Sequence, residues 1–221
     1  MIKIFKAPKP QVLIDNAAKW TKEYCDCLKA DIEPSEEIKY RYRHPHIKQT
    51  LEEETHGKCA YCESKIKQVA HGDIEHILPK NKNARPELYV EWDNLTLSCE
   101  QCNRAGKGKY YDSNLPLVNP YTDTPDDYLR DFGPLIMPLP GNDRGIATEK
   151  VVKLNRGALV ERRTERITSI ETLLQIWTKE TNPTLKKLLE DELHNEYSNE
   201  KEYSSTVKSF LKQNGFPVKN Y

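Results

Sequence analysis

The sequence predicts an α+β fold that is mainly helical, with a small cysteine-framed core between two helical regions. Three observations predict it. Two C-x-x-C pairs enclose a short segment with strand character near the middle of the chain. From residue 158 onward, apolar residues recur at spacings of three and four, which is the period of an amphipathic helix. Between these parts, residues 113–140 are rich in proline, which limits regular structure there.

These observations divide the chain into three parts. Residues 1–56 are expected to form an N-terminal helical segment. Residues 57–112 are expected to form the core that contains both cysteine pairs. Residues 113–221 are expected to begin as a proline-rich wrap across that core and to end as a helical C-terminal lobe.

The N-terminal segment is expected to start extended and to continue with two helices. Residues 1–14 are interpreted as extended, and Asp15 has the side chain of an N-cap for a helix to about residue 28. A second helix is expected over residues 47–55. Cys25 and Cys27 fall in the first helix. Because residues two apart on a helix do not face each other, we interpret them as buried or idle thiols and not as a second metal site.

The four cysteines of the core have the spacing of a zinc site. Cys59 and Cys62 form one C-x-x-C pair, and Cys99 and Cys102 form the other. Two residues between cysteines let both sulfurs of a tight turn face one ion, and four thiolates favour tetrahedral zinc. Redox chemistry or disulfides are the alternative, which an intracellular setting disfavours. A closed four-cysteine site has no open position, so we expect this zinc to be structural.

Between the two pairs, residues 72–79 are expected to form a short strand that ends in a loop, because Pro79 interrupts any regular ladder. Glu75 and His76 are neighbours in this segment. If the segment is extended, their side chains point to opposite faces. If it is distorted there, both side chains can approach one site. The residues alone leave both alternatives open.

The order of these motifs resembles the HNH endonuclease family in its zinc-containing form. The chain carries C-x-x-C, E-H-I-L-P, W-D-N-L and C-x-x-C-N, followed by lysines, within residues 58–112. The resemblance implies a ββα-metal core, in which two antiparallel strands and a helix surround one catalytic divalent ion. It also implies an enzyme that hydrolyses nucleic-acid phosphodiester bonds. One departure is that Glu75 stands where the family more often has Asp, which moves the carboxylate one methylene further out.

The resemblance assigns roles to individual residues. His76 corresponds to the general base, and an imidazole with an ordinary pKa of ~6.5 can take a proton from water near neutral pH. Glu75 and Asn103 correspond to the ligands of the catalytic ion, and their oxygens suit Mg²⁺ or Mn²⁺. Asn94 corresponds to the middle residue of the motif, which is expected to hydrogen-bond backbone near the catalytic loop.

Basic residues follow the second cysteine pair, where a helix is expected to begin. Arg104, Lys107 and Lys109 lie within two turns of its start and are candidates for phosphate contacts. The alternative is that they form an ordinary solvated face. His71 is a further candidate for a substrate contact, because it lies close to the motif in sequence.

The region after residue 112 is expected to change from a wrap to helices. The wrap contains too many apolar residues for a loose linker, so we expect it to pack across the core. Residues 151–154 are expected to form a short strand or a turn. Three helices are then expected, one before Pro183, one after it and one over residues 202–211. They either pack on the core or offer a docking surface for another protein.

Charge and hydropathy exclude several classes of protein. Charged residues make up 31% of the chain and balance to a net charge of zero, so no global basic field recruits nucleic acid. No apolar run approaches the ~18 residues of a membrane span, and the N-terminus lacks the apolar segment of a signal peptide. We therefore expect a cytoplasmic protein without membrane association, whose affinity for its substrate comes partly from a partner.

A wider resemblance covers most of the chain. The start Met-Ile-Lys-Ile and the runs at residues 57–63, 74–80 and 153–162 are similar to the PtuB nucleases. These are the HNH subunits of Septu anti-phage systems, some of which are linked to retrons. The resemblance implies antiviral defence as the role and an ABC/SMC-like ATPase of the PtuA type as the partner, with retron components as further candidate partners.

Two other functions stay open on the sequence. The chain could be a zinc-stabilised module that binds nucleic acid or protein without catalysis, or an HNH nuclease of a restriction or mobile-element system. The set of Glu75, His76, Asn94 and Asn103 favours catalysis, because a zinc scaffold alone does not need it. Nucleic acid is the expected substrate, with DNA favoured and RNA open.

Overall fold

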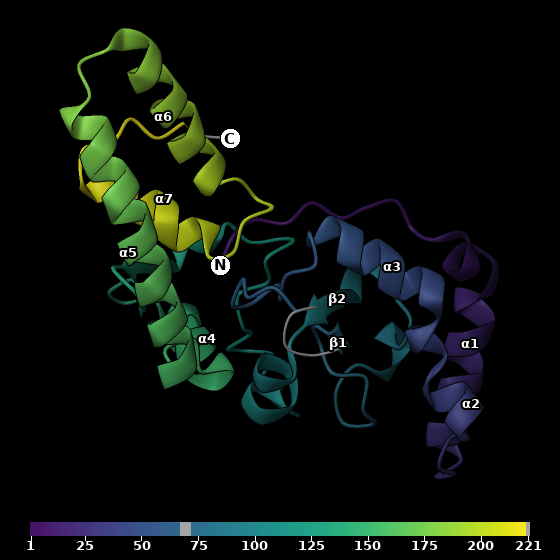
Figure 1. Cartoon of the computed structure of the whole chain (residues 1–221). Coiled ribbons are helices and arrows are strands. Elements are labelled where there is room, and N and C mark those ends of the chain that lie inside the picture. Colours follow the sequence, from purple (N-terminus) through teal and green to yellow (C-terminus); the bar gives the residue numbers. More distant parts are fainter. Residues whose placement is uncertain (67–71, 220–221) are drawn as a thin grey trace.

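The computed structural model describes residues 1–66 and 72–219 and has two parts (Figure 1). One part surrounds the strands β1 (Asp73–His76) and β2 (Leu95–Ser98). The other part consists of three helices, α5 (Gly157–Lys179), α6 (Pro183–Glu196) and α7 (Ser204–Gln213). The expected α+β fold with mainly helical structure is confirmed. None of the helices in the described ranges is both long and apolar enough to cross a bilayer.

The chain starts close to α7 and then crosses the molecule to α1 (Gln11–Lys29), as the purple trace in Figure 1 shows. The prediction that the chain stays extended to residue 14 and that Asp15 caps the helix is wrong. The helix begins directly after Pro10, which occupies the N-cap position, so Asp15 lies inside it. Leu13 is fully buried in the core, and this packing favours helix from its first turn.

Two short elements lead from α1 towards the core. These are α2 (Glu36–Lys39), which Ser35 caps through its hydroxyl, and the 3-10 turn Arg41–Arg43. The helix α3 (Pro45–Glu54) follows and confirms the second predicted helix. It begins two residues earlier than predicted, because proline is well tolerated at the first helical position.

The strands β1 and β2 are antiparallel, with Glu75 opposite Thr96. After β2 the chain turns into the π-helix Gln101–Lys107, so two strands and a helix stand in the order that the motif predicts. This helix approaches the helix α4 (Asp143–Val152) closely at Gly106. A Cβ added there would lie 3.1 Å from the Val152 carbonyl oxygen, so the contact requires glycine.

The wrap is ordered and joins the core, as expected. Val118 and Ile136 are buried in the same hydrophobic cluster as the strands. The wrap also contains the antiparallel hairpin of β3 (Leu129–Phe132) and β4 (Leu135–Pro138). This hydrophobic cluster contains residues from both sides of residue 112. The boundary predicted at residue 112 therefore divides the motif from the wrap, but both belong to one core.

The prediction of a short strand or turn at residues 151–154 is wrong for residues 151 and 152, and a turn is present at residues 153 and 154. The helix α4 (Asp143–Val152) covers the first two of these positions, and only a turn follows. The Asn142 side chain caps α4 by accepting a hydrogen bond from the Gly145 amide at 2.8 Å. Lys153 then ends the helix in the left-handed conformation, at φ 57°.

The C-terminal helices have a hydrophobic cluster of their own. Helices are present before Pro183, after it and near the C-terminus, as predicted. Buried residues from these helices and the segments around them form the cluster: Ile170, Leu174, Leu193, Tyr197, Val207, Leu211 and Phe216. The first turns of α5 belong to the core instead, since Leu159 packs there.

Glu63 connects the core with the C-terminal part. It follows Cys62 directly, at φ 64°, and is buried. Its carboxylate accepts hydrogen bonds from the hydroxyls of Ser204 at 2.9 Å and Ser205 at 2.6 Å, which lie at the start of α7. It also pairs with the amino group of Met1 at 2.8 Å. The first cysteine turn is therefore fixed to α7 by buried polar contacts.

Candidate metal centre and active site

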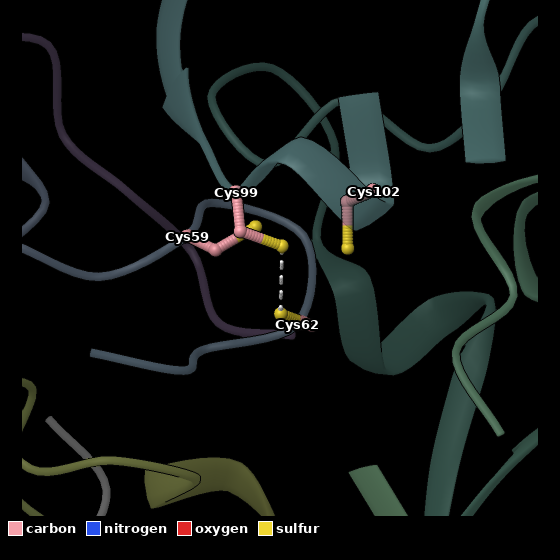
Figure 2. Close-up of side chains that lie close together, drawn as sticks. All are labelled: Cys59, Cys62, Cys99 and Cys102. Atoms are coloured by element: carbon pink, nitrogen blue, oxygen red, sulfur yellow. Dashed lines mark hydrogen bonds between the residues drawn. The ribbon is translucent and has the colours of Figure 1, made fainter. Parts of the chain in front are cut away.

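The four cysteines of the core converge on one point. Their Sγ atoms lie within 4.8 Å of one another, and all four residues are buried. The Sγ atoms of Cys62 and Cys99 are 3.8 Å apart, as the dashed line in Figure 2 shows. Four thiolates bound to zinc at ~2.3 Å form a tetrahedron with edges of ~3.8 Å. None of the cysteines forms a disulfide. The cluster therefore fits a closed tetrahedral zinc site.

The two cysteine pairs come from different elements of the core (Figure 2). The first pair lies in a turn before β1, and the Ala60 amide in that turn donates a hydrogen bond to the Leu97 carbonyl of β2 at 3.0 Å. The second pair lies where β2 passes into the π-helix. Within the described parts of the chain, no other group of three or more His, Cys, Asp or Glu residues brings its ligand atoms this close together.

Arg156, which directly precedes α5, directs its guanidinium at the cysteine cluster. Its Nη1 donates a hydrogen bond to Cys102 Sγ at 3.4 Å, and its Nη2 lies 3.7 Å from Cys99 Sγ and 3.8 Å from Cys62 Sγ. Burial alone would lower the pKa of Arg156, but the nearby cysteine sulfurs raise it. Because zinc with four thiolates carries a net charge of about −2, this guanidinium stabilises the loaded site.

His76 is buried and held in one tautomer. Its Nε2 lies 2.8 Å from the Tyr89 carbonyl oxygen. A carbonyl oxygen can only accept a hydrogen bond, so Nε2 carries the proton and Nδ1 keeps a free lone pair. The Tyr42 ring packs edge-on against the imidazole, with 4.7 Å between the centroids. Burial lowers the pKa of His76 to about 3, so the ring is neutral at physiological pH.

Glu75 points away from His76, as neighbours in an extended strand do. Its Oε1 lies 2.5 Å from Lys107 Nζ of the π-helix, and both side chains are almost fully buried. Lys107 Nζ also donates a hydrogen bond to the His76 carbonyl oxygen at 2.9 Å. Burial raises the pKa of Glu75, and the ammonium of Lys107 opposes this rise. Lys107 thus acts as the counter-cation of Glu75.

Asn103 contacts Asp73, a residue that the motif comparison did not single out. Asn103 Nδ2 lies 3.3 Å from Asp73 Oδ2, and Arg104 forms a two-pronged ion pair with the same carboxylate at 2.9 and 3.0 Å. Asp73 and Glu75 lie two residues apart on β1 and so share one face of the strand. The D-x-E spacing was the sequence signal that could have identified Asp73.

Asn94 fixes the loop that follows His76. Its Oδ1 accepts a hydrogen bond from the Leu78 amide at 2.8 Å. Its Nδ2 donates to the Leu78 carbonyl at 2.9 Å and to the Leu88 carbonyl at 3.3 Å. These are backbone contacts of the kind expected for this residue, and a part in catalysis stays a prediction.

The predicted site residues thus form two separate groups of contacts, one around His76 and one around Glu75. The Asn94 bonds and the His76 ring lie on one side of β1, and the Glu75 carboxylate lies with the π-helix on the other. Of the predicted phosphate contacts, Arg104 and Lys107 are engaged with carboxylates, whereas Lys109 is exposed. His71 lies outside the described residues.

Comparisons with known proteins agree with these motifs. The HNH endonuclease family model matches residues 59–109. The chain is 31% identical to Septu protein PtuB of Bacillus thuringiensis over 235 aligned positions, which cover 97% of this chain and 83% of that protein. It is 29% identical to Septu protein PtuB of Bacillus mycoides over 243 positions, which cover 96% and 81%.

A third relative carries a different name. The chain is 27% identical to Septu protein PtuA of Bacillus mycoides over 163 positions, which cover 61% of this chain and 23% of that protein. No solved structure matches the chain significantly.

Proposed function

This chain belongs to the PtuB family of HNH endonucleases, and on that premise we propose that it cleaves nucleic acid as the effector of a Septu-type anti-phage complex. His76 is the general base in this proposal. Glu75 and Asn103 hold the catalytic ion, Asn94 positions the loop after His76, and the four cysteines hold a structural zinc. DNA is the favoured substrate.

The hydrogen bond between His76 Nε2 and the Tyr89 carbonyl carries this proposal. It leaves Nδ1 free to accept a proton from the water that attacks phosphorus. As the new P–O bond forms, the bond from phosphorus to the 3′ oxygen breaks. The leaving oxygen takes a proton from solvent, so the products are a 5′-phosphate and a 3′-hydroxyl.

Glu75 and Asn103 offer the carboxylate and amide oxygens that Mg²⁺ or Mn²⁺ prefers. An ion bound there would neutralise the charge that develops on the phosphate. Asp73 supports this assignment, because it shares the Glu75 face of β1 and contacts Asn103. Lys107 occupies Oε1 of Glu75, so we propose that it holds this carboxylate until an ion binds.

The proposed partner is an ABC/SMC-like ATPase of the PtuA type. The similarity to a protein named PtuA supports it, because that protein contains a stretch that resembles this chain. The zero net charge of the chain also supports a partner that contributes to substrate binding. Retron components are a second candidate partner, on the sequence resemblance alone.

A cleavage assay tests the enzymatic part of the proposal. Plasmid DNA and total RNA are incubated with wild-type protein or His76→Ala, with Mg²⁺, with Mn²⁺ and with EDTA, in the presence and absence of the ATPase partner. We expect cutting that requires the metal and falls by ~10²–10⁴-fold in His76→Ala, which is the typical contribution of a general base. Metal-dependent cutting that persists in His76→Ala would refute its role.

His56→Asn serves as the matched control. His56 is exposed and adopts φ 52°, a conformation that asparagine tolerates well. The His56→Asn protein should cut as wild type does. Both His56→Asn and His76→Ala should keep the zinc content and the circular dichroism spectrum of the wild type.

A non-catalytic module is the second candidate function, and the buried pair of Glu75 and Lys107 favours it. A carboxylate that already has a buried counter-cation needs no metal ion for its stability. In that case, wild-type protein with its partner binds nucleic acid but leaves it uncut under every metal condition.

A further inference from the structure

A run of alternating basic and aromatic residues lies against the candidate general base. Residues 39–46 read Lys-Tyr-Arg-Tyr-Arg-His-Pro-His and connect α2 to α3. The ring of Tyr42, in the middle of this run, is the one that packs edge-on against the imidazole of His76. Tyr42 therefore places this run beside His76.

Lys80, from the loop after β1, reaches into a cluster of tyrosine rings. Tyr24 and Tyr89 stack with 4.2 Å between their centroids and an interplanar angle of 11°. Tyr42 packs edge-on against Tyr89 at 6.1 Å. Lys80 Nζ lies 5.0, 5.1 and 5.6 Å from the centroids of Tyr24, Tyr42 and Tyr89. Aromatic rings attract a cation, so this cluster holds the ammonium in a fixed place.

Arg43 lies on the same ring system. Its guanidinium carbon is 4.0 Å from the centroid of Tyr40 and 5.6 Å from that of Tyr42. The Arg43 side chain is exposed, so its remaining N–H donors face solvent. Arg43 and Lys80 thus both lie close to the ring of Tyr42, which itself contacts His76.

Arg43 and Lys80 differ from neighbouring cations in having no acidic partner. Lys39 and Arg41 both form ion pairs with glutamates. Neither Arg43 nor Lys80 forms an ion pair anywhere in the described ranges, 1–66 and 72–219. Burial, together with Lys39 and Arg43, lowers the pKa of Lys80 to about 8, as expected for an ammonium in positive surroundings.

We propose that Arg43 and Lys80 bind a backbone phosphate of the nucleic acid next to the phosphate that is cleaved, with Tyr40 and Tyr42 as their aromatic support. This inference rests on the proposed nuclease function and names the cations that hold its substrate. Arginine and lysine are the usual protein ligands of nucleic-acid phosphates. An anion here neutralises charge that the protein leaves uncompensated.

The distances fit a neighbouring phosphate. The Tyr42 ring contacts both His76 and Lys80, so Lys80 Nζ lies at most about 10 Å from the imidazole centroid. One strand rises ~3.4 Å along the axis per nucleotide, so this separation corresponds to roughly two to three nucleotides at most. Contacts at this range orient the strand and leave the reacting phosphate free to approach His76.

Two of the three cations named by the motif order, Lys107 and Arg104, are less suited to this task. Lys107 is buried against Glu75, and Arg104 holds Asp73 with two hydrogen bonds. A phosphate could engage either of them only by replacing a carboxylate. Arg43 and Lys80 need no such exchange, since their present neighbours are rings.

The test measures binding without cleavage, in the full-length His76→Ala protein. Fluorescein-labelled 20-mers of single- and double-stranded DNA and RNA are titrated by anisotropy at several salt concentrations. The variant Arg43→Gln/Lys80→Met is added on this background, and Met suits the aromatic surroundings of Lys80. We expect at least tenfold weaker binding of every sequence and a salt slope reduced by about 1, as for one phosphate that is no longer neutralised.

Lys179→Gln/Lys212→Gln is the matched control. It removes the same charge from exposed positions on α5 and α7. It should leave affinity and slope almost unchanged, and Lys80→Arg should retain binding. The inference fails if the His76→Ala protein does not bind the probes at low salt, or if the double variant binds as its parent does. Cleavage by the wild-type protein, in which His76 is intact, separates this failure from failure of the nuclease proposal.

Discussion

The cysteine cluster and the Glu75–His76 site share the same scaffold but differ in how complete they are. Both use the strand pair β1–β2 and the π-helix that follows it. The cysteines all face one point, with their sulfur atoms within 4.8 Å. The candidate catalytic groups face different neighbours, since His76 contacts Tyr89 and Tyr42 while Glu75 contacts Lys107.

The difference teaches that the fold alone assembles the full ligand set of the cysteine cluster, whereas it pairs the candidate metal ligand Glu75 with a protein cation. The cysteine cluster has its complete ligand set and the guanidinium of Arg156 beside it. At Glu75, a protein cation neutralises the buried carboxylate, which would otherwise carry a large desolvation cost. Variants of the two sites should therefore respond in opposite ways to added metal.

The largest effect is expected for Cys59→Ser. Zinc binding free energy is folding free energy in sites of this kind. Loss of one buried ligand should remove the zinc and destabilise the core by more than about 5 kcal/mol, since loss of a metal belongs to the most severe class of substitutions. Zinc content by atomic absorption and thermal unfolding measure this. Cys27→Ser, outside the cluster, is the control, and a stable zinc-free Cys59→Ser protein would contradict the structural role.

The next largest effect is expected for Lys107→Met, measured without divalent ions other than zinc. Removal of one partner of a buried ion pair costs about 3–5 kcal/mol, because Glu75 is left charged and alone. Added Mn²⁺ should restore much of this stability, in contrast to the cysteine variant. Chemical denaturation with and without Mn²⁺ gives both values.

The double variant Glu75→Gln/Lys107→Met separates the ion pair from simple packing. It leaves no isolated charge, so it should be more stable than Lys107→Met alone, and Mn²⁺ should not stabilise it further. Equal stabilisation of both variants by Mn²⁺ would show that the ion acts somewhere other than at Glu75.

The cysteine cluster could be predicted from sequence because its geometry is local. Each C-x-x-C turn sets two ligands by itself, and only one long-range step brings the turns together. The short strand at Glu75 and the three C-terminal helices were predictable for the same reason, since their periodicity is local. The early start of α1 and the helix α4 were missed, because burial of Leu13 and the Asn142 cap outweighed the pattern.

The surroundings of the reactive groups could not be predicted from sequence. Arg156 lies 54 residues from Cys102, and no spacing rule connects them. Lys107 reaches Glu75 from a π-helix, whose wider turn departs from the α-helical spacing that a sequence pattern assumes. Arg43 and Lys80 lie on one cluster of rings because four tyrosines from three segments pack together. Tertiary contacts of this kind carry no local signal.

A smaller effect is expected for Arg156→Met, and it tests whether the cysteine site is complete by itself. Loss of residues that orient or neutralise metal ligands typically costs 10–100-fold in metal affinity. We expect zinc to transfer to a chelator about 10-fold faster, as followed with a colorimetric zinc indicator. Arg162→Met, an exposed arginine of α5 paired with Glu165, is the control. An unchanged transfer rate would show that the guanidinium contributes only to docking of α5.

The smallest effect concerns the pH dependence of nucleic-acid binding. It tests the surroundings of His76 and not the cysteine cluster. Lys80 has a pKa of about 8 in the free protein, lowered by burial and by the nearby Lys39 and Arg43, with Glu33 opposing. A bound phosphate raises this pKa. The contribution of Lys80 to binding is therefore complete below pH 8 and is lost as the pH rises through the pKa of the bound form.

The three surrounding tyrosines do not interfere with this titration, because burial raises the pKa of each of them, that of Tyr24 to about 12. In the His76→Ala background, the salt slope of nucleic-acid binding should become shallower by less than 1 between pH 7 and pH 9.5. Lys80→Arg should keep its slope, since arginine stays charged. Lys80→Met should start from the shallower slope and not change. A slope that falls equally in all three proteins would place the titrating group elsewhere and remove Lys80 from the phosphate site.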